Sequence, residues 1–576
     1  MMDNALKWQK TLNHTNLQKG FNTTVSCKNK VFCMTHYRGK FKAIDQHTNT
    51  VGDLMLETLS NWGIQQAFGV AGPSNSSLID SLQTQGKITY FEVSRESAAA
   101  FAVSAYGSLT GRPAACFAMS RFGSTHLLSA LWDANVNRAP VVALTGQVTP
   151  KSDSYNQPFF KHYSNENVAQ WSQTVGYNSQ HTELANLACK NAILNRGVSH
   201  LIFPDGTPRL ALKGPMQAGS PRGRLPSQNI APPQDALQDA IDLLRDSERP
   251  AIIAGHGARD RMEAVIQLAE QLRAPVITTF KGKGLIPDNH PLAGGVLGLG
   301  GSPVASELVN EADALLVFGA SFSQHTGISA DRPTVQVDYE LAALAKSHPI
   351  DVPVWGEIGV TAQALSDDFL GDMWTQDQTA SIAAHWETWR QTKRHQALST
   401  DENALNTAIL FETLSEAVNP DAIITLDVDE TTDTFGHYFE CVEQSILMSG
   451  HPDSDGFAFP AAMGAWSATQ ENDLKFKDRQ VISISGDIGF DRHLSEIHTA
   501  VKYKMNITHV LIKQETDGLD EQINLPDHSF ADYAELCGAM GLLANDKAAL
   551  DTALAQALAY DGPALVEVTI SQGSAQ

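Results

Sequence analysis

The chain has 576 residues, among them 41 basic and 64 acidic side chains, which give a formal net charge of −23. Hydrophobic residues make up 42% of it, a share that is typical of a globular protein and too high for a disordered or fibrous one. No apolar run reaches the roughly 18 residues of a membrane-spanning helix. Because the acidic excess would also repel phosphate groups, we expect neither a membrane nor a nucleic acid as a partner.

The first 50 residues differ in charge from the rest of the chain. They hold eight Lys and Arg residues against two Asp residues, and they lack the apolar core of a secretory signal. We predict that residues 1–50 form a disordered basic tail or an N-terminal extension, with Met34 as an alternative start. An organellar transit peptide stays open as an alternative.

The six cysteines are few and widely spaced. This usage indicates reduced thiols, so we expect a cytoplasmic protein. Cys27 and Cys33 have no second pair at zinc-finger spacing, and a structural zinc is therefore not expected.

Short helices and strands alternate from Val51 onward. The periodicity predicts helices over 51–62, 96–109 and 125–136, and strands over 66–70, 88–93, 114–119 and 140–145. Strands that alternate with helices through short connections predict a parallel sheet with helices on both faces.

The same pattern returns twice, after two segments that resemble linkers at 214–233 and 368–402. The second set has predicted strands at 250–254, 275–279, 314–318 and 334–337, and the third at 422–427, 480–485, 508–512 and 563–569. We therefore predict an α/β protein with three doubly wound parallel-sheet domains, at 51–213, 234–367 and 403–576.

The order of short motifs is more informative about function than the fold class, because such sheets host many activities. The motifs read FGVAGPSNSSLIDSL at 68–82, EVSRESAAAFAVSAYGSLTG at 92–111, GFAFPAAMGA at 456–465 and ISISGDIGF at 482–490. This layout resembles the thiamine diphosphate (ThDP) enzymes of the acetolactate synthase, pyruvate oxidase and pyruvate decarboxylase group. The resemblance runs from about Val51 to the C-terminus and implies a pyrimidine-binding, a central Rossmann-like and a diphosphate-binding domain.

In the first domain, the resemblance implies that Glu96 is the catalytic glutamate that bonds the pyrimidine ring of ThDP. Gly72 and His126 match cofactor-binding positions of the family. Without the surrounding match, Glu96 would be read as an ordinary acidic residue at a helix N-terminus, where the helix dipole favours it.

In the third domain, the resemblance implies a Mg²⁺ ion that bridges the diphosphate. Asp487 matches the metal-binding aspartate, and Gln514, 27 residues later, stands where the family has Asn. A Gln oxygen still suits a hard cation, although its extra methylene displaces that oxygen. We predict Asp487, Gln514 and Thr516 as metal ligands. The predicted cofactor-binding residues beside them are Gly486, Ile488 and Gly489.

Several acidic residues stand where the family has apolar residues or glycine. Asp455 replaces a bulky apolar residue before Gly456, and we predict both as cofactor-binding positions. The family's Asp-Val-Gly turn reads DVDE at 427–430, and Ser-Gly-Pro-Gly reads SRFG at 120–123. Carboxylates beside a diphosphate cost Coulomb energy unless cations compensate. These departures favour an unusual substrate, an altered cofactor mode or a lost activity.

Glycine-rich turns in the middle domain leave a second cofactor open. They lie at 255–259, 281–284, 299–302 and 318–322, and Asp338 follows a strand. Such turns let a backbone approach a pyrophosphate, but tight βα turns need glycine in any case. In FAD-using relatives matching loops hold the flavin, so FAD stays an alternative here.

Taken with the resemblance, the sequence predicts a ThDP- and Mg²⁺-dependent enzyme that decarboxylates a 2-oxo acid such as pyruvate and ligates the product to a carbonyl acceptor, as acetolactate synthase does. Arg95, Arg121 and Lys513 are candidate basic groups for the anionic substrate. Relatives share each site between two subunits, which implies a homodimer or homotetramer. Two alternatives are a FAD-containing pyruvate oxidase-like enzyme and a catalytically silent homologue with a structural or sensing role.

Overall fold

In the computed structural model, residues 49–576 form one compact unit. The structure describes residues 49–570 other than 120–121, 148–167, 324, 329–330, 348, 399–404, 430–431, 433, 452–453 and 515–528. The predicted tail, Arg121, Glu430 and Thr516 therefore lie outside the described residues. No helix of the described part is long and apolar enough to cross a membrane.

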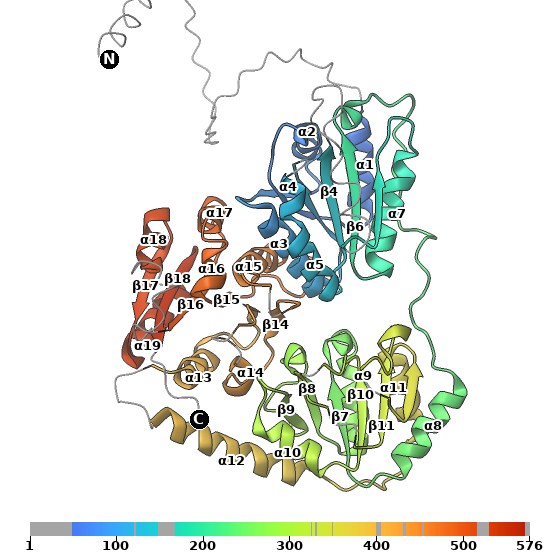
Figure 1. Ribbon diagram of the computed structural model, residues 1–576, viewed down its shortest axis with the longest axis vertical. Helices are drawn as coiled ribbons and strands as arrows, with labels where there is room; N and C mark the ends of the chain where they lie inside the picture. The colour runs from blue at the N-terminus through green and yellow to red at the C-terminus, as the bar shows by residue number, and fades with distance from the viewer. Residues whose placement is uncertain are drawn as a thin grey trace, which may run out of the picture. The chain divides into compact units, whose positions relative to one another are not determined.

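Three six-stranded sheets, each with all its strands parallel, form this compact unit (Figure 1). The first has the order β2-β1-β3-β4-β6-β5, the second β12-β11-β10-β7-β8-β9 and the third β14-β13-β15-β16-β18-β17. The prediction of an α/β protein with three parallel sheets is confirmed. When the strands of each sheet are numbered from one to six along the chain, the first and third sheets both have the order 2-1-3-4-6-5. The second sheet has the order 6-5-4-1-2-3.

The strands of the first sheet are β1 (Gln66–Gly69), β2 (Thr89–Glu92), β3 (Ala114–Ala118), β4 (Val141–Gln147), β5 (Trp171–Thr174) and β6 (Val198–Pro204). Those of the second are β7 (Pro250–Ala254), β8 (Val276–Thr279), β9 (Ala293–Leu297), β10 (Ala314–Phe318), β11 (Thr334–Asp338) and β12 (Val352–Trp355). Those of the third are β13 (Ile423–Leu426), β14 (Ser445–Met448), β15 (Val481–Gly486), β16 (Ile507–Gln514), β17 (Met540–Ala544) and β18 (Ala564–Ile570).

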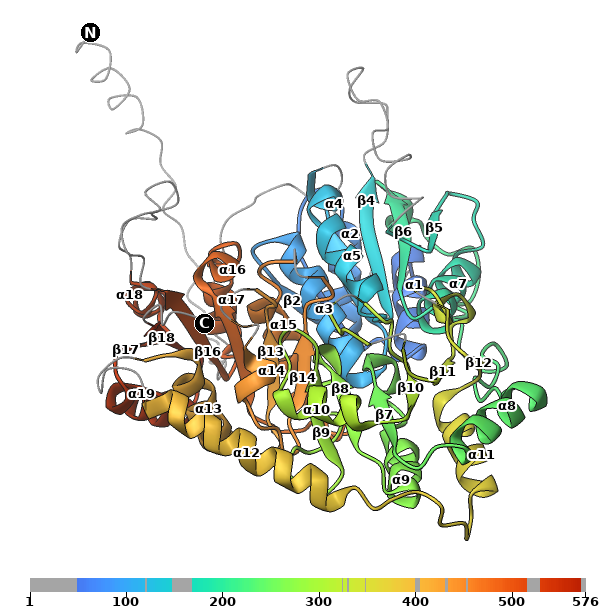
Figure 2. The ribbon, with the colours of Figure 1, turned by 60° about the horizontal axis from the view of Figure 1, so that its bottom comes forward.

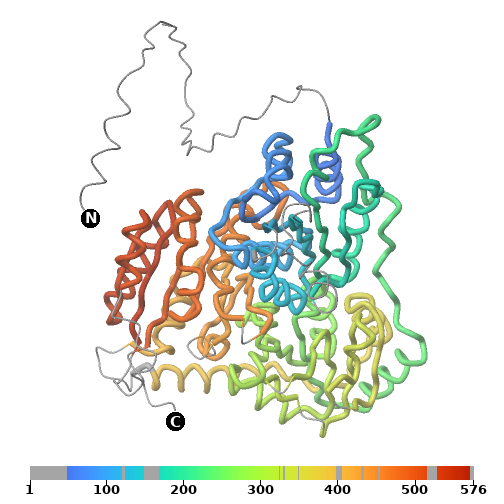
Figure 3. The backbone as a smooth tube through the Cα atoms, turned by 45° about the horizontal axis from the view of Figure 1, so that its top comes forward, coloured from blue at the N-terminus to red at the C-terminus, as the bar shows by residue number. Residues whose placement is uncertain are grey.

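Helices connect these strands in chain order, as the backbone trace of Figure 3 follows from blue to red. Around the first sheet they are α1 (Val51–Asn61), α2 (Ser76–Gln85), α3 (Glu96–Thr110), α4 (Phe122–His126), α5 (Leu128–Val136) and α7 (His181–Leu194). Around the second they are α8 (Gln234–Arg245), α9 (Met262–Leu272), α10 (Pro303–Glu311), α11 (Ile358–Asp368) and α12 (Thr379–Leu398). Around the third they are α13 (Thr407–Ala417), α14 (Phe435–Tyr438), α15 (Ala458–Thr469), α16 (Asp487–Asp491), α17 (Glu496–Tyr503), α18 (Phe530–Cys537) and α19 (Lys547–Ala559).

Two residues of the sequence, Thr50 and Asp53, determine where helix α1 begins. Thr50 and Asp53 form a capping box, in which the Thr50 side chain accepts the Asp53 N–H and the Asp53 carboxylate accepts the Thr50 N–H at 2.9 Å. Two backbone donors of the first turn are thereby satisfied. The apolar residues Met55, Leu56 and Leu59 of α1 then lie buried against the first sheet.

Helices α3 and α15 join the first and third sheets (Figures 1 and 2). Both are alanine-rich and buried, and one apolar core includes both. At their contact, Gly464 leaves no room for a side chain because an added Cβ would overlap the carbonyl oxygen of Ala102. At the far end of α3, Tyr106 donates a 2.8 Å hydrogen bond to Glu471 of the third domain. The two helices therefore pack almost backbone to backbone.

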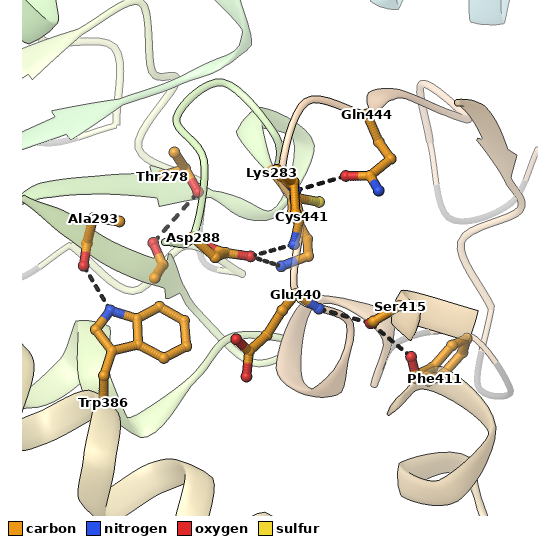
Figure 4. Close-up of polar contacts among 12 residues, drawn as sticks. Thr278, Lys283, Asp288, Ala293, Trp386, Phe411, Ser415, Glu440, Cys441 and Gln444 are labelled. Carbon is orange, nitrogen blue, oxygen red and sulfur yellow. Dashed lines mark hydrogen bonds and ion pairs between the residues drawn. The ribbon is translucent and has the colours of Figure 1, made fainter. Parts of the chain in front are cut away.

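Hydrogen bonds beside a buried ion pair of the second domain join that domain to the third (Figure 4). Asp288, in the loop after β8, lies 3.2 Å from the Lys283 ammonium and accepts the Cys441 N–H at 2.7 Å. The Asp288 N–H in turn donates to the Cys441 carbonyl at 2.8 Å. Nearby, the Trp386 indole of α12 donates to the Ala293 carbonyl at 2.7 Å. The segment read as a linker at 368–402 thus carries a long helix that packs into the second core.

Candidate cofactor site

The carboxyl ends of β15 and β16 bring two predicted metal ligands to one sheet edge. Gly486 pairs with Ile512 in the parallel register. Asp487 directly follows Gly486, and Gln514 lies two residues beyond Ile512, both half-buried. The shared edge explains why the two residues lie 27 positions apart, because a helix and a returning strand separate them. Their role as ligands stays a prediction.

The protein alone offers little to a metal ion at this edge. Among the described residues, no group of three or more His, Cys, Asp or Glu side chains could hold one. Mg²⁺ requires about six oxygen ligands and commonly takes several from water and substrate phosphates. An ion held by Asp487 and Gln514 would therefore depend on a diphosphate for much of its shell, as the resemblance implies.

A buried carboxylate organises the glycines beside this edge. Asp427, at the end of β13, accepts the Gly456 N–H at 3.0 Å and the Ala458 N–H at 2.7 Å. A Cβ at Gly489 would overlap the Asp427 carboxylate, so only glycine fits there. Burial is the main cause that raises the pKa of Asp427 to about 8.

Gly456 needs glycine for two reasons. Its φ of +85° is a left-handed conformation, and a Cβ would lie 2.6 Å from the His493 Nδ1 atom. We call Gly456, Gly486 and Gly489 the glycine cradle. Protein atoms therefore fill the Cβ direction at Gly456 and Gly489, and the cradle places backbone without side chains beside Asp487, which fits a diphosphate group held there.

Two of the acidic residues predicted to repel a diphosphate have local partners. Asp429 accepts the Thr432 N–H at 3.1 Å and the Gly486 N–H at 3.3 Å. Asp455 forms a 2.6 Å ion pair with Arg492. Much of the Coulomb cost expected from the sequence is therefore offset locally, which makes the acidic edge compatible with a bound anion. Ile488 is exposed beside it, and its predicted cofactor contact stays untested.

Glu96 begins α3 and lies in a recess at the edge of the first sheet. Its side chain is 8% exposed, and its Oε2 atom lies 3.1 Å from Nδ1 of His126. A Cβ at Gly123 would lie 2.5 Å from Glu96 Oε1. The structure thus brings the predicted catalytic glutamate and His126 together, with Gly123 packed directly against the Glu96 carboxylate.

Gly72 lies at the same edge, after β1. A Cβ there would overlap the side chain of Met119, which also borders Gly123. The Gly72 N–H donates to the Asn75 side chain at 2.8 Å. The first-domain residues predicted from the resemblance therefore gather at one place, although no observation assigns them a ligand.

The candidate substrate cations have protein surroundings of their own. Arg95 is the N-cap residue of α3 and makes no side-chain cap hydrogen bond. The Lys513 ammonium lies 3.8 Å from the carboxylate of Glu567, which is buried. Lys513 is thus drawn to a protein carboxylate, which weakens the case for it as a substrate group.

The middle domain has a crevice where its strand order reverses, between β7 and β10. There the Gly257 N–H donates to the Gly319 carbonyl at 3.0 Å. Asp338 ends the adjacent strand β11, and burial raises its pKa while Arg138 and Arg196 of the first domain oppose that shift. The Nε2 atom of His256 is buried with no hydrogen-bond partner among the described residues.

Further cations surround this crevice. Arg259 and Lys281 are both largely buried, and burial lowers the pKa of Lys281 to about 8. Lys281 also contacts Asn137 of the first domain. Cations around glycine turns, with an acidic residue at the next strand end, have the chemistry that an anionic dinucleotide such as FAD requires. The residues present fit that group.

Comparison with known proteins places these features in a family. Three domain models match in order: the thiamine pyrophosphate enzyme N-terminal TPP binding domain at residues 49–172, the central domain at 237–365 and the C-terminal TPP binding domain at 431–568. The chain belongs to the thiamine pyrophosphate enzyme family. Thiamine pyrophosphate is another name for ThDP, so the family named from the motifs is confirmed.

Relatives within the family cover most of the chain. YdaP of Bacillus subtilis, which is named as a thiamine pyrophosphate-containing protein, is 27% identical over 90% of this chain and 92% of its own length. An acetolactate synthase of Arthrospira platensis is 26% identical over 90% of this chain and 93% of its own. A pyruvate oxidase of Lactiplantibacillus plantarum is 25% identical over 85% of this chain and 81% of its own. These ThDP relatives carry different names at similar identity, so the comparison leaves the substrate open.

Sequence reasoning understated one residue of the site. Asp427 was read as part of a matching turn, whereas in the structure it fixes both Gly456 and the start of α15. The available signal was a charged residue directly after the wholly buried strand β13.

Proposed function

We propose that the protein is a ThDP- and Mg²⁺-dependent enzyme that acts on a 2-oxo acid such as pyruvate by decarboxylation and carboligation. The observation that carries the proposal is the glycine cradle around Asp427, at the sheet edge that also bears Asp487 and Gln514. Family membership supports the cofactor, and the acetolactate synthase relative supports the reaction type.

When bound, ThDP would supply a nucleophilic carbon for addition to a 2-oxo acid and a positively charged ring that takes up the electron pair left by CO₂. The protein's own part is to bind and orient. Asp487 and Gln514 would hold the metal ion, and the glycine cradle would receive the diphosphate. Glu96 would share a proton with the pyrimidine ring at Oε1, the oxygen that faces Gly123.

The proposal includes a second copy of the chain. Among the described residues, no hydrogen bond or ion pair is present between the Glu96 carboxylate and the third domain. A site that draws Glu96 from one subunit and the glycine cradle from another would need at least a homodimer. Sedimentation of the ThDP-loaded protein tests this, and a monomer that is fully active would contradict it.

Calorimetric titration with ThDP and Mg²⁺, followed by a pyruvate turnover assay, tests the proposed function. The wild type should bind ThDP only with Mg²⁺ present and release CO₂ from pyruvate. Glu96→Gln should bind but lose turnover, whereas Asp487→Ala should lose Mg²⁺-dependent binding. Failure of the wild type to bind millimolar ThDP would overturn the proposal.

A FAD-containing pyruvate oxidase-like enzyme is the second candidate. The cations around the middle-domain crevice and the unpartnered His256 Nε2 atom favour it, as does the pyruvate oxidase relative. A purified protein with a flavin absorption spectrum, bleached by pyruvate under anaerobic conditions, would establish this alternative. A colourless protein that turns over pyruvate would exclude it.

A catalytically silent homologue is the third candidate, favoured by Gln514 and Asp455 at family positions that otherwise carry Asn and an apolar residue. It predicts ThDP binding without turnover, or no binding. The substitution Gln514→Asn separates the cases. If the wild type is silent for want of a proper ligand, this variant should gain Mg²⁺-dependent affinity for ThDP.

A further inference from the structure

The turn that carries Glu96 is held by the third domain. One carboxylate oxygen of Glu496, at the start of α17, accepts the Ser94 N–H at 3.1 Å and the Arg95 N–H at 3.0 Å. Its other oxygen accepts the Thr499 hydroxyl at 2.7 Å. Glu496 is completely buried. A residue 400 positions away in the chain therefore binds the two amides directly before Glu96.

Helix α3 has no cap of its own. The N-cap residue, Arg95, makes no side-chain cap hydrogen bond. Free amides at a helix start require acceptors, and the helix dipole favours a negative charge there. Glu496 places a buried carboxyl group beside this start and accepts the N–H groups of Ser94 and Arg95, the two residues that precede the helix, which fixes the turn that leads into Glu96.

His493 makes a second contact, one turn earlier. Its Nε2 atom and the Ser97 hydroxyl are 2.9 Å apart, and its ring meets Phe101 of α3 edge-on at 5.7 Å. On its other side, the His493 Nδ1 atom leaves no room for a side chain at Gly456. One buried ring therefore touches both the helix that carries Glu96 and the glycine cradle.

We propose that His493 and Glu496 are positioning residues that set the geometry of Glu96 through α3. This inference rests on the proposed function. Neither residue contacts the Glu96 carboxylate, so their effect passes through the backbone of Ser94 and Arg95 and the side chain of Ser97. Loss of the contacts should let the first turn of α3 move, and misplacement of about 1 Å in a catalytic group lowers a rate by about 100-fold.

The chain provides a matched control on the same helix. Lys502 of α17 also reaches the first domain, in a 2.9 Å ion pair with Glu92 whose side chains are about half exposed. Lys502→Gln removes a contact between the same domains but leaves the Ser94–Ser97 turn untouched. An exposed pair of this kind contributes about 0–1 kcal/mol in general, so the control should behave as wild type.

Hydrogen–deuterium exchange of the protein without cofactor is the first measurement. Amides in the peptide around Glu96 should exchange at least tenfold faster in Glu496→Ala than in wild type, and faster to a smaller extent in Ser97→Ala. Glu496→Gln should restore part of the protection, because its amide oxygen can still accept both backbone N–H groups. Unchanged exchange in a folded Glu496→Ala would overturn the inference.

The exchange rate of the thiazolium proton of bound ThDP, followed by NMR at saturating cofactor, is the second measurement. We expect about a 100-fold slower rate in Glu496→Ala, a smaller loss in Glu496→Gln and in His493→Gln, and none in Lys502→Gln. ThDP affinity should change far less than the rate. A wild-type rate in these variants would overturn the positioning role, whereas a wild type that neither binds nor activates ThDP would overturn the proposed function instead. Should Glu496→Ala fail to fold, Glu496→Gln and Ser97→Ala decide the outcome.

Discussion

The first and third sheets share one strand order but carry different chemistry at equivalent places. In each, the second strand of the sheet leads into the long buried helix that joins the two domains, β2 into α3 and β14 into α15. The first of these helices starts with the buried carboxylate of Glu96, and the second follows the left-handed Gly456. The same scaffold therefore presents a carboxylate at one helix start and, at the other, backbone whose Gly456 and Ala458 N–H groups donate to Asp427.

Under the proposed function, this difference would divide the binding of one cofactor between the first and third domains. A carboxylate suits a proton-sharing ring, whereas backbone without side chains suits a diphosphate. The two helices also pack against each other, so each start is fixed relative to the other domain. The middle sheet has another strand order, so the comparison of helix starts does not extend to it.

The largest expected effect comes from the acid itself. Glu96→Gln should lower turnover of a 2-oxo acid by about 10²–10⁴-fold, because an amide cannot share a proton with the ring. ThDP affinity should stay close to that of wild type. Glu92→Gln, four residues earlier and half exposed, is the matched control and should keep full turnover. Equal loss in both variants would remove the functional side of the comparison.

A second test addresses the middle sheet, outside the shared pattern. Asp288→Ala leaves the buried Lys283 ammonium without its partner and should lower the free energy of unfolding by about 3–5 kcal/mol. Asp368→Asn, which breaks an exposed pair with Arg245, should cost less than about 1 kcal/mol. Urea unfolding measures both, and equal effects would contradict the buried character of this junction.

The inner strands were predictable from sequence, whereas most edge strands were not. Residues 314–318 form a continuous apolar run that lies wholly buried as β10. The edge strands β5, β12, β14 and β17 are partly exposed and only four or five residues long, too short for a period to stand out in the sequence. Edge strand β9 begins with Ala-Gly-Gly, and the inner strand β6 carries Ser199 and His200. These residues interrupt the apolar run that would have predicted a strand.

The site was only partly predictable for a related reason. Glu96 and Asp487 could be predicted as site residues because each lies in a local motif that resembles the family. The contact of Glu496 with Ser94 spans 402 positions, and no local pattern marks such a pair. The partners of Asp429 and Asp455 were likewise absent from the sequence argument, which counted charges without the Gly486 amide or Arg492.

The raised pKa of Asp427 offers a pH test of the third-domain part of the candidate site, which carries the glycine cradle. A carboxyl with a folded-state pKa of about 8, above its unfolded value near 4, binds a proton more tightly in the folded protein. Its stabilising contribution is complete below about pH 4 and is lost as the pH rises to about 8. Wild type should therefore lose thermal stability relative to Asp427→Asn between pH 5 and pH 8.5. A melting-temperature difference that is constant over this range would show that the carboxyl is ionised when folded.

The packing of the two equivalent helices is tested at their closest approach. Gly464→Ala places a methyl group against the Ala102 carbonyl and should lower stability by about 1–3 kcal/mol. Ala465→Gly, at the next position of α15, is the control. It should cost about 1 kcal/mol of stability through helix propensity and lost burial. A smaller effect at Gly464 than at Ala465 would mean that α3 and α15 can separate without loss.

The smallest effect is expected where the acidic edge meets solvent. The Asp455–Arg492 pair is partly exposed, with the Arg492 side chain 56% accessible, so Asp455→Asn should change stability by less than about 1 kcal/mol. The same substitution removes one negative charge beside the glycine cradle and leaves Arg492 unpaired. ThDP affinity in Mg²⁺ should therefore rise, by a factor that shrinks as salt is added, because exposed charges are screened. Arg492→Gln is the opposite control and should weaken affinity. If both variants bound ThDP like wild type at low salt, the acidic edge would lie outside the reach of the diphosphate, and the division of roles between the two helix starts would rest on Glu96 and the cradle alone.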